Sequence, residues 1–270
     1  MSPAYKVLCK EKRPKICRTK LQAYNFSCLY RTLEYNDVRI IGAADGEDVR
    51  LGTSLLTECP ALDVVIDDMK ASREVLRKNM SERRFIEQHL AGKTTSLTAE
   101  ETPKGEDPAS FTADQVILPL LACLGYSKSN IVRSKGAQGP DMTINLKGAA
   151  IAVVVKPLDY EMYEKDSVQI LSHISDEEGD GKCMAGIFTD GAHWLLGLKV
   201  DGRPVSSGLI DLRGLLRSMY SKDIDESEYA KHAGTWKFFT ELYSSDTLLL
   251  SVRTIEDRFR KQQSIQVGSD

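Results

Sequence analysis

The chain has 270 residues, 41% of them hydrophobic and 28% charged, with a formal net charge of −3 at pH 7. This is the composition of an ordinary soluble protein, and the length allows one large domain or two. The net negative charge argues against a surface built entirely for nucleic acid, but it is compatible with a local basic patch.

Membrane and secretory signals are absent from the sequence. No apolar run reaches the roughly 20 residues that a membrane helix needs, and the polar, basic N-terminus is not a secretory signal. The six cysteines are scattered without a C-x-x-C pair, which favours reduced thiols over a disulfide framework or a zinc site. We therefore expect an intracellular protein, cytoplasmic or nuclear, without membrane contact.

The first segment is strongly basic, because residues 5–20 hold a single acid, Glu11, among many lysines and arginines. A basic arm of this kind can contact the phosphates of a nucleic acid. The candidate contacts are Lys10, Lys12, Arg13, Lys15 and Arg18. A solvated edge strand explains the same charges, since lysines on edge strands are ordinary protection against aggregation.

A small β-meander and a long helix are predicted next. Residues 21–51 alternate apolar and polar side chains, and turn signals bound a strand at residues 38–41. From residue 61 to 90, apolar residues recur at helical spacing with Arg and Glu between them. The helix packs on the meander or pairs with a second copy of the chain. Residues 1–92 are therefore predicted to be an interaction or oligomerisation module, with a homo-oligomer as one outcome.

Residues 93–110 are rich in Thr, Glu, Gly and Pro and predict a linker, after which residues 111–270 form the second domain. That domain opens with a helix that runs to about Cys123, followed by a short strand at residues 131–133. Further on, a helix is predicted at 160–175, strands at 183–189 and 194–200, a short helix at 212–220 and two helices within 226–262.

A β-hairpin stands at the centre of this domain. Residues 142–146 and 149–155 predict two antiparallel strands, and the second is apolar enough to be covered on both faces. Asp141 precedes the first strand and Lys156 follows the second, so the hairpin brings them together. An acid on one strand with an acid-x-Lys on its neighbour forms a site for Mg²⁺ that activates water against a phosphodiester. Position 154, which shares a face with Lys156, is Val.

Five sequence elements occur in the order seen in one known family. They are the helix ending in Leu124-Gly125-Tyr126, Pro140-Asp141, Val154-Val155-Lys156, the helix from Gln169 to His173, and Gly186-Ile187-Phe188-Thr189-Asp190-Gly191 followed by His193-Trp194. Over about residues 111–200 the chain resembles the PD-(D/E)XK nuclease superfamily, in particular the N-terminal nuclease-like domain of type I restriction-enzyme R subunits.

The resemblance implies an α/β fold with a restriction-endonuclease-like mixed sheet flanked by helices. It also implies that Asp141, Lys156 and Gln169 occupy catalytic positions and that Asp141 is a ligand of Mg²⁺. The missing acid at Val154 predicts a site that is impaired. Acids that could replace it are Asp114, Asp159, Glu161 and Glu164, although acids near a helix start are also explained by the helix dipole.

Three functions stay open at this point. The leading hypothesis is a catalytically impaired nuclease fold that binds nucleic acid or a protein partner, with residues 1–92 supplying assembly. The second is an active Mg²⁺-dependent DNA endonuclease that uses Asp141, Lys156 and a displaced acid. The third is a structural, self-assembling protein without nucleic-acid contact, because a fold does not fix a function.

Overall fold

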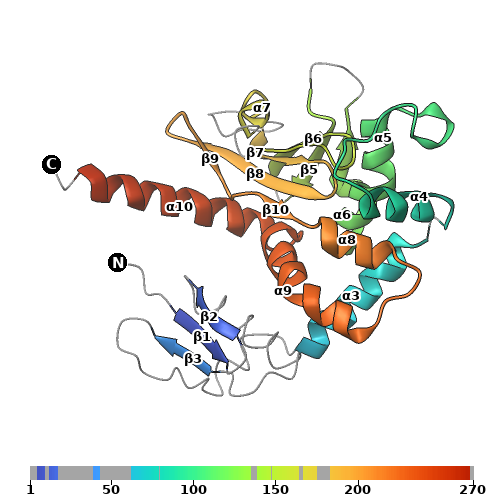
Figure 1. Cartoon of the computed structure of the whole chain (residues 1–270). Coiled ribbons are helices and arrows are strands. Elements are labelled where there is room, and N and C mark those ends of the chain that lie inside the picture. Colours follow the sequence, from blue (N-terminus) through green and yellow to red (C-terminus); the bar gives the residue numbers. More distant parts are fainter. Residues whose placement is uncertain are drawn as a thin grey trace. The chain divides into compact units, whose positions relative to one another are not determined.

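The structure is a computed structural model of the whole chain. It describes residues 5–9, 12–17, 39–42, 62–78, 80–134, 139–146, 148–163, 167–174 and 183–267 (Figure 1). The chain divides into two compact units, the first made of residues 1–71 and 222–238 and the second of residues 72–221 and 239–270. The predicted division into 1–92, 93–110 and 111–270 follows the order of the chain, whereas each unit is assembled from two separate stretches.

The first unit contains a small antiparallel sheet. Its strand order is β2-β1-β3, with β1 at Tyr5–Cys9, β2 at Lys12–Cys17 and β3 at Arg39–Gly42. The basic segment therefore supplies two strands, and β3 matches the strand expected at 38–41. The rest of the predicted meander lies outside the described residues.

Parts of two helices belong to the first unit. They are α3, which runs over Leu62–Leu76, and α9, which runs over Glu226–Tyr243. The indole Nε1 of Trp236 donates to the Asp68 carboxylate at 2.6 Å, and the Lys70 ammonium lies 3.3 Å from the Glu226 carboxylate. These polar contacts join the two helices within this unit.

The single helix predicted over residues 61–90 is wrong in one respect, because the structure has two helices there. After α3 the backbone tightens, with the amide of Lys78 donating to the carbonyl of Val75, and α4 then runs over Met80–Ala91. The apolar spacing continued across the break because each helix buries one face. Ile86 and Leu90 of α4 are fully buried.

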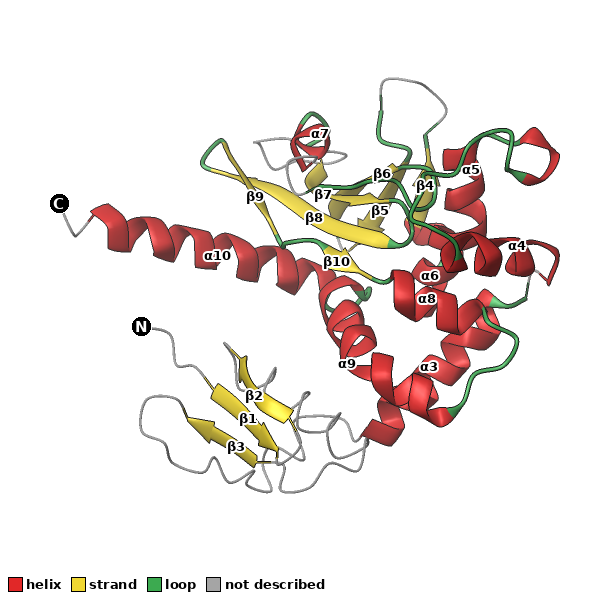
Figure 2. Ribbon diagram, viewed as in Figure 1, coloured by secondary structure: helices red, strands yellow, loops and turns green. Residues whose placement is uncertain are grey.

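The second unit is built on a mixed sheet (Figure 2). Its order is β10-β8-β7-β6-β5-β4, with β9 paired to β8. Among the strand pairs that the structure describes in this sheet, β6 and β7 are the one parallel pair. The strands are β4 Ile131–Arg133, β5 Met142–Leu146, β6 Ala149–Val155, β7 Cys183–Thr189, β8 His193–Val200, β9 Arg203–Ser206 and β10 Ile210–Asp211. The central hairpin and the predicted α/β fold, a mixed sheet flanked by helices, are confirmed.

Helices cover both faces of this sheet. They are α5 Pro108–Thr112, a π-helical continuation at Ala113–Ile117, α6 Leu118–Cys123, α7 Ser167–Leu171, α8 Arg213–Tyr220, the end of α9 and α10 Leu248–Val267. Ile170 of α7 packs on one face with Phe188 and Leu195. On the other face, the Trp194 ring meets the rings of Phe239 and Tyr243 edge-on, with centroids 5.1 and 5.3 Å away.

The segment predicted to be a linker, residues 93–110, belongs to the second unit. Its Leu97 side chain is buried, and the Leu97 amide donates to the carbonyl of Leu158 at 2.9 Å. A 3-10 turn at Pro103–Gly105 and the first residues of α5 complete it. Among the described residues, no helix is both long enough and apolar enough to span a membrane.

Close packing of α7 on the sheet generates a stability prediction. A Cβ added at Gly186 would lie 1.9 Å from Cγ2 of Ile170, whereas one at Gly197 would lie 3.4 Å from the more flexible Cδ1. We expect Gly186→Ala to lower the free energy of unfolding by about 1–3 kcal/mol and Gly197→Ala to have a smaller effect. Urea denaturation of both variants checks this, and equal effects would contradict the packing described.

Candidate functional site

One end of the large sheet gathers charged side chains. Since β6 and β7 are parallel and their neighbours antiparallel, the end of β4, the start of β5, the ends of β6 and β7, the start of β8 and the end of β10 meet there. Adjacent strands lie about 4.8 Å apart. The residues at this end, called the sheet-end row below, are Arg133, Asp141, Lys156, Asp190, His193 and Asp211. Basic and acidic residues alternate along it.

Asp141 lies beside the end of β6, as the predicted hairpin requires. Its carboxylate Oδ2 accepts a hydrogen bond from the backbone N–H of Val155 at 2.7 Å. The side chain thereby continues the hydrogen-bond ladder between β5 and β6 past the last paired residues. One of the two carboxylate oxygens is committed to the backbone.

Position 154 is apolar in its surroundings as well as in its side chain. Val154 is 9% exposed and packs in a cluster with the buried side chains of Met162, Ile170, Ile174, Phe188 and Leu195. An ionised carboxylate at this position would be poorly hydrated, because its neighbours are aliphatic and aromatic.

Lys156 is half-buried at the rim of that cluster. Its ammonium lies 5.4 Å from the centroid of the Phe188 ring and 5.7 Å from that of Tyr160. Both distances suit attraction between a cation and an aromatic face. Among the residues that the structure describes, no carboxylate lies within 4.0 Å of this ammonium.

The other acids proposed for the site have partners or lie outside the described residues. The Asp114 carboxylate pairs with the Arg133 guanidinium, Asp159 is buried against Arg213, and Glu161 accepts a hydrogen bond from the Tyr163 hydroxyl. Glu164 is not among the described residues. Gln169 is exposed on α7, although its neighbour Ile170 is buried.

These residues fit a Mg²⁺ ion poorly. Mg²⁺ takes octahedral oxygen ligands and is usually anchored by carboxylates. Asp141 offers one free oxygen, and the described residues contain no group of three or more His, Cys, Asp or Glu placed to hold a metal.

The basic arm is only partly described. Lys12, Arg13 and Lys15 belong to β2, while Lys10 and Arg18 lie outside the described residues.

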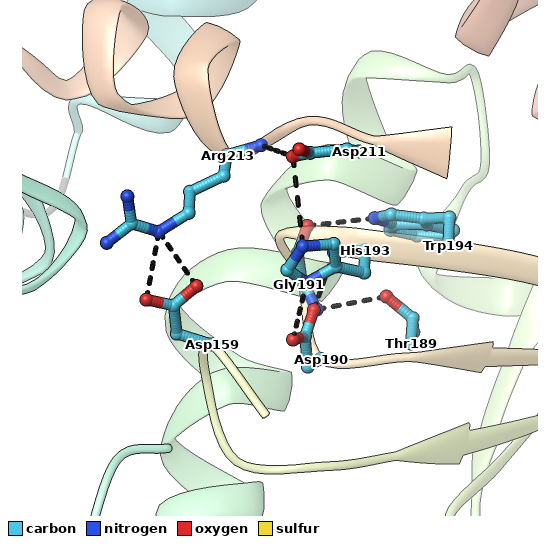
Figure 3. A network of polar contacts seen from close by, with 8 residues as sticks. All are labelled: Asp159, Thr189, Asp190, Gly191, His193, Trp194, Asp211 and Arg213. Carbon is cyan, nitrogen blue, oxygen red and sulfur yellow. Dashed lines mark hydrogen bonds and ion pairs between the residues drawn. The ribbon is translucent and has the colours of Figure 1, made fainter. Parts of the chain in front are cut away.

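A polar network adjoins the other half of the sheet-end row (Figure 3). In the turn between β7 and β8, the Asp190 carboxylate accepts the backbone N–H of His193 at 2.5 Å and lies 2.9 Å from His193 Nδ1. Gly191, with φ of +85°, donates its N–H to the Thr189 hydroxyl and accepts from the indole of Trp194. The turn is therefore fixed by side chains as well as by backbone pairing.

A buried ion pair continues the network. The Asp159 carboxylate is 0% exposed, and both of its oxygens lie 2.9 Å from Nε of Arg213. The same guanidinium donates to the carbonyl of Gly92 at 3.0 Å. The Asp211 carboxylate accepts the backbone N–H of Arg213 at 2.8 Å and lies 3.8 Å from His193 Nε2.

Proton affinities in the network follow from burial and charge. Burial raises the pKa of Asp190, and its contacts with His193 only partly oppose this effect. Burial alone would lower the pKa of His193, but the hydrogen bond to Asp190 and the charges of Asp190, Asp211 and Asp159 raise the pKa overall. The neighbouring carboxylates thus favour the protonated imidazole.

Reasoning from the sequence placed Asp190, Gly191 and His193 in the last motif of the family resemblance, between two predicted strands, but it missed the ion pairs. The separation of 54 residues between Asp159 and Arg213 leaves no local signal. The Asp190–His193 spacing of three residues was visible, yet it acquires meaning only once the turn geometry is known.

Comparisons of the chain with protein families, curated proteins and solved structures found no match.

The Asp159–Arg213 pair generates a stability prediction. Arg213→Met leaves a buried carboxylate without its cation, so we expect the free energy of unfolding to fall by about 3 kcal/mol. Arg217→Met, at an exposed arginine on the same helix, is the control and should change it by under about 0.5 kcal/mol. Thermal or urea unfolding measures both. Adding Asp159→Asn to Arg213→Met should recover part of the loss, and an additive further loss would contradict the pairing.

Proposed function

We propose that the second unit carries a nuclease-like domain of the PD-(D/E)XK type, over about residues 111–200, that no longer cuts phosphodiesters and instead binds a nucleic acid or a protein partner. The order of elements supports this proposal: a helix, the antiparallel strands β4, β5 and β6, helix α7, and then β7 parallel to β6. With this order Asp141 and Lys156 fall at one end of the sheet.

The observation that carries the proposal is the apolar burial of Val154. Hydrolysis assisted by Mg²⁺ needs carboxylate oxygens that hold the ion against the attacking and leaving oxygens. At position 154 an aliphatic side chain packs into the cluster beneath α7 instead. One carboxylate oxygen of Asp141 accepts a hydrogen bond from the Val155 amide. Lys156 adds a positive charge but no ligand for a metal ion.

An active endonuclease with a displaced acid is less well supported. Asp114 and Asp159 each have an arginine partner, and Glu161 is exposed beside the Tyr163 hydroxyl. A displaced-acid site would have to break one of these ion pairs, break the hydrogen bond between Tyr163 and Glu161, or use Glu164. In the purely structural alternative, the protein assembles through residues 1–92 and does not bind nucleic acid. Measurements of DNA binding distinguish this alternative from the other two.

The first test is a cleavage assay with the full chain on supercoiled plasmid and single-stranded DNA, in Mg²⁺ or Mn²⁺. We expect no cutting by the wild type or by Asp141→Ala. Val154→Glu restores a second carboxylate, and Val154→Leu is its apolar control. Thermal unfolding of each variant confirms that it is folded. Metal-dependent cutting by the wild type that is lost in Asp141→Ala would overturn the proposal.

The second test asks whether the partner is a nucleic acid. If the basic arm contacts phosphates, replacing Lys12, Arg13 and Lys15 by Ala weakens DNA binding and reduces the dependence of log K on log salt by about one for each lost contact. Replacing the exposed basic residues Lys93, Arg203 and Arg217 by Ala removes the same charge elsewhere and serves as the control. Equal weakening by both triple variants would exclude a specific role for the arm. No binding by the wild type would favour a protein partner.

A further inference from the structure

The imidazole of His193 lies between two carboxylates that come from different elements. Nδ1 is 2.9 Å from Asp190 in the β7–β8 turn, and Nε2 is 3.8 Å from Asp211 at the end of β10 (Figure 3). We propose that His193 is a proton-operated clasp: its protonated imidazole holds the corner between β10 and α8 against the β7–β8 turn, and loss of the proton loosens that corner.

The geometry makes the Asp211 contact depend on the proton. In the neutral imidazole, the proton stays on Nδ1 and is donated to the buried carboxylate of Asp190. The other tautomer, with the proton on Nε2, would place the lone pair of Nδ1 against that carboxylate. Nε2 then turns a lone pair towards Asp211, and the contact becomes unfavourable. In the protonated imidazole both nitrogens donate, so both contacts are attractive.

The surrounding charges act in the same direction. Besides Asp190 and Asp211, the carboxylate of Asp159 acts on His193 from the turn after β6, and it is neutralised in large part by Arg213 of α8. The His193 side chain is 14% exposed and that of Asp211 is 68% exposed. The proton is therefore shielded on the Asp190 side and exchanges with solvent on the Asp211 side.

The clasp joins elements that also position the candidate site. Asp211 accepts the backbone N–H of Arg213, and the Arg213 side chain holds Asp159, three residues beyond Lys156. The buried side chains of Leu212, Leu215 and Leu216 keep α8 on the unit in either state. The opening that follows loss of the proton is therefore local, and it reaches the turn that follows Lys156.

The direction of the pH effect follows from the raised pKa of His193. The protonated form is favoured in the folded chain, so the stabilisation is complete below the ordinary histidine value of 6.5 and is lost as the pH rises through the higher folded value. The clasp does not depend on whether the domain is nuclease-like.

Asp211→Asn is the decisive variant. Its amide oxygen can still accept the Arg213 N–H at the start of α8, but the charge opposite His193 is removed. Asp201→Asn, at another exposed aspartate of the same unit, is the matched control. The pKa of His193 is read from its ring resonance by NMR, and His193→Gln identifies that resonance among the four histidines.

We expect the pKa of His193 to lie above 6.5 in the wild type, to fall in Asp211→Asn and to stay in place in Asp201→Asn. Hydrogen-exchange protection of the Leu212 and Arg213 amides, corrected for intrinsic rates, should fall roughly tenfold from about pH 5.5 to about 9 in the wild type. In His193→Gln it should be flat. An unchanged His193 pKa in Asp211→Asn, or protection that stays constant while His193 titrates, would overturn the clasp.

Discussion

Because β6 and β7 run parallel while the other pairs of the large sheet are antiparallel, their carboxyl ends meet the starts of β5 and β8 at one sheet end. This pairing decides which side chains become neighbours. The β5–β6 hairpin brings Asp141 next to the end of β6. The parallel pairing then lets the backbone N–H of Lys156 donate to the carbonyl of Thr189 and places the β7–β8 turn at the same sheet end. An antiparallel β6–β7 pair would send Asp190 and His193 to the opposite end.

Polar side chains are accommodated in different ways in the two halves of the sheet-end row. Around β5 and β6 the interior is apolar, the one acid is bonded to a backbone amide, and the lysine rests on aromatic rings. Around β7, β8 and β10 two carboxylates are fully buried, and each is matched by a basic partner. Buried charges are tolerated only when paired in this way. The half around β5 and β6 is therefore suited to binding a partner by charge and shape. In the half around β7, β8 and β10, the ion pairs connect the β7–β8 turn, the turn after β6 and the start of α8.

The sequence was most informative where periodicity acts within one element. The hairpin at residues 142–155, the strands at 183–189 and 194–200, and the two C-terminal helices follow from alternation and helical spacing. The structure has all of them, with β8 beginning one residue earlier, at His193. The break between α3 and α4 was missed because apolar spacing continued through it. The proximity of Asp141 to the end of β6 was predictable, since a hairpin fixes its own register.

The rest required tertiary structure. The partner of Asp159 is distant in the chain, and no propensity distinguishes an aspartate in a left-handed turn that meets an arginine from one that faces solvent. The burial of Leu97 was hidden by the polar residues around it, which made the segment resemble a linker. The composition of a segment indicates the average exposure of its residues, whereas its packing can depend on one buried side chain such as Leu97.

The discontinuity of both units has a consequence for how the protein is made. The first unit needs residues 222–238 to pack against its early helix, and the second needs Phe239 and Tyr243 to cover Trp194. A ribosome delivers the chain from the N-terminus, and domains generally fold as units. Neither unit can close until residues 222–243 have been synthesised. The nascent chain therefore carries one face of the large sheet without these aromatic side chains from the time β8 is made until α9 follows it.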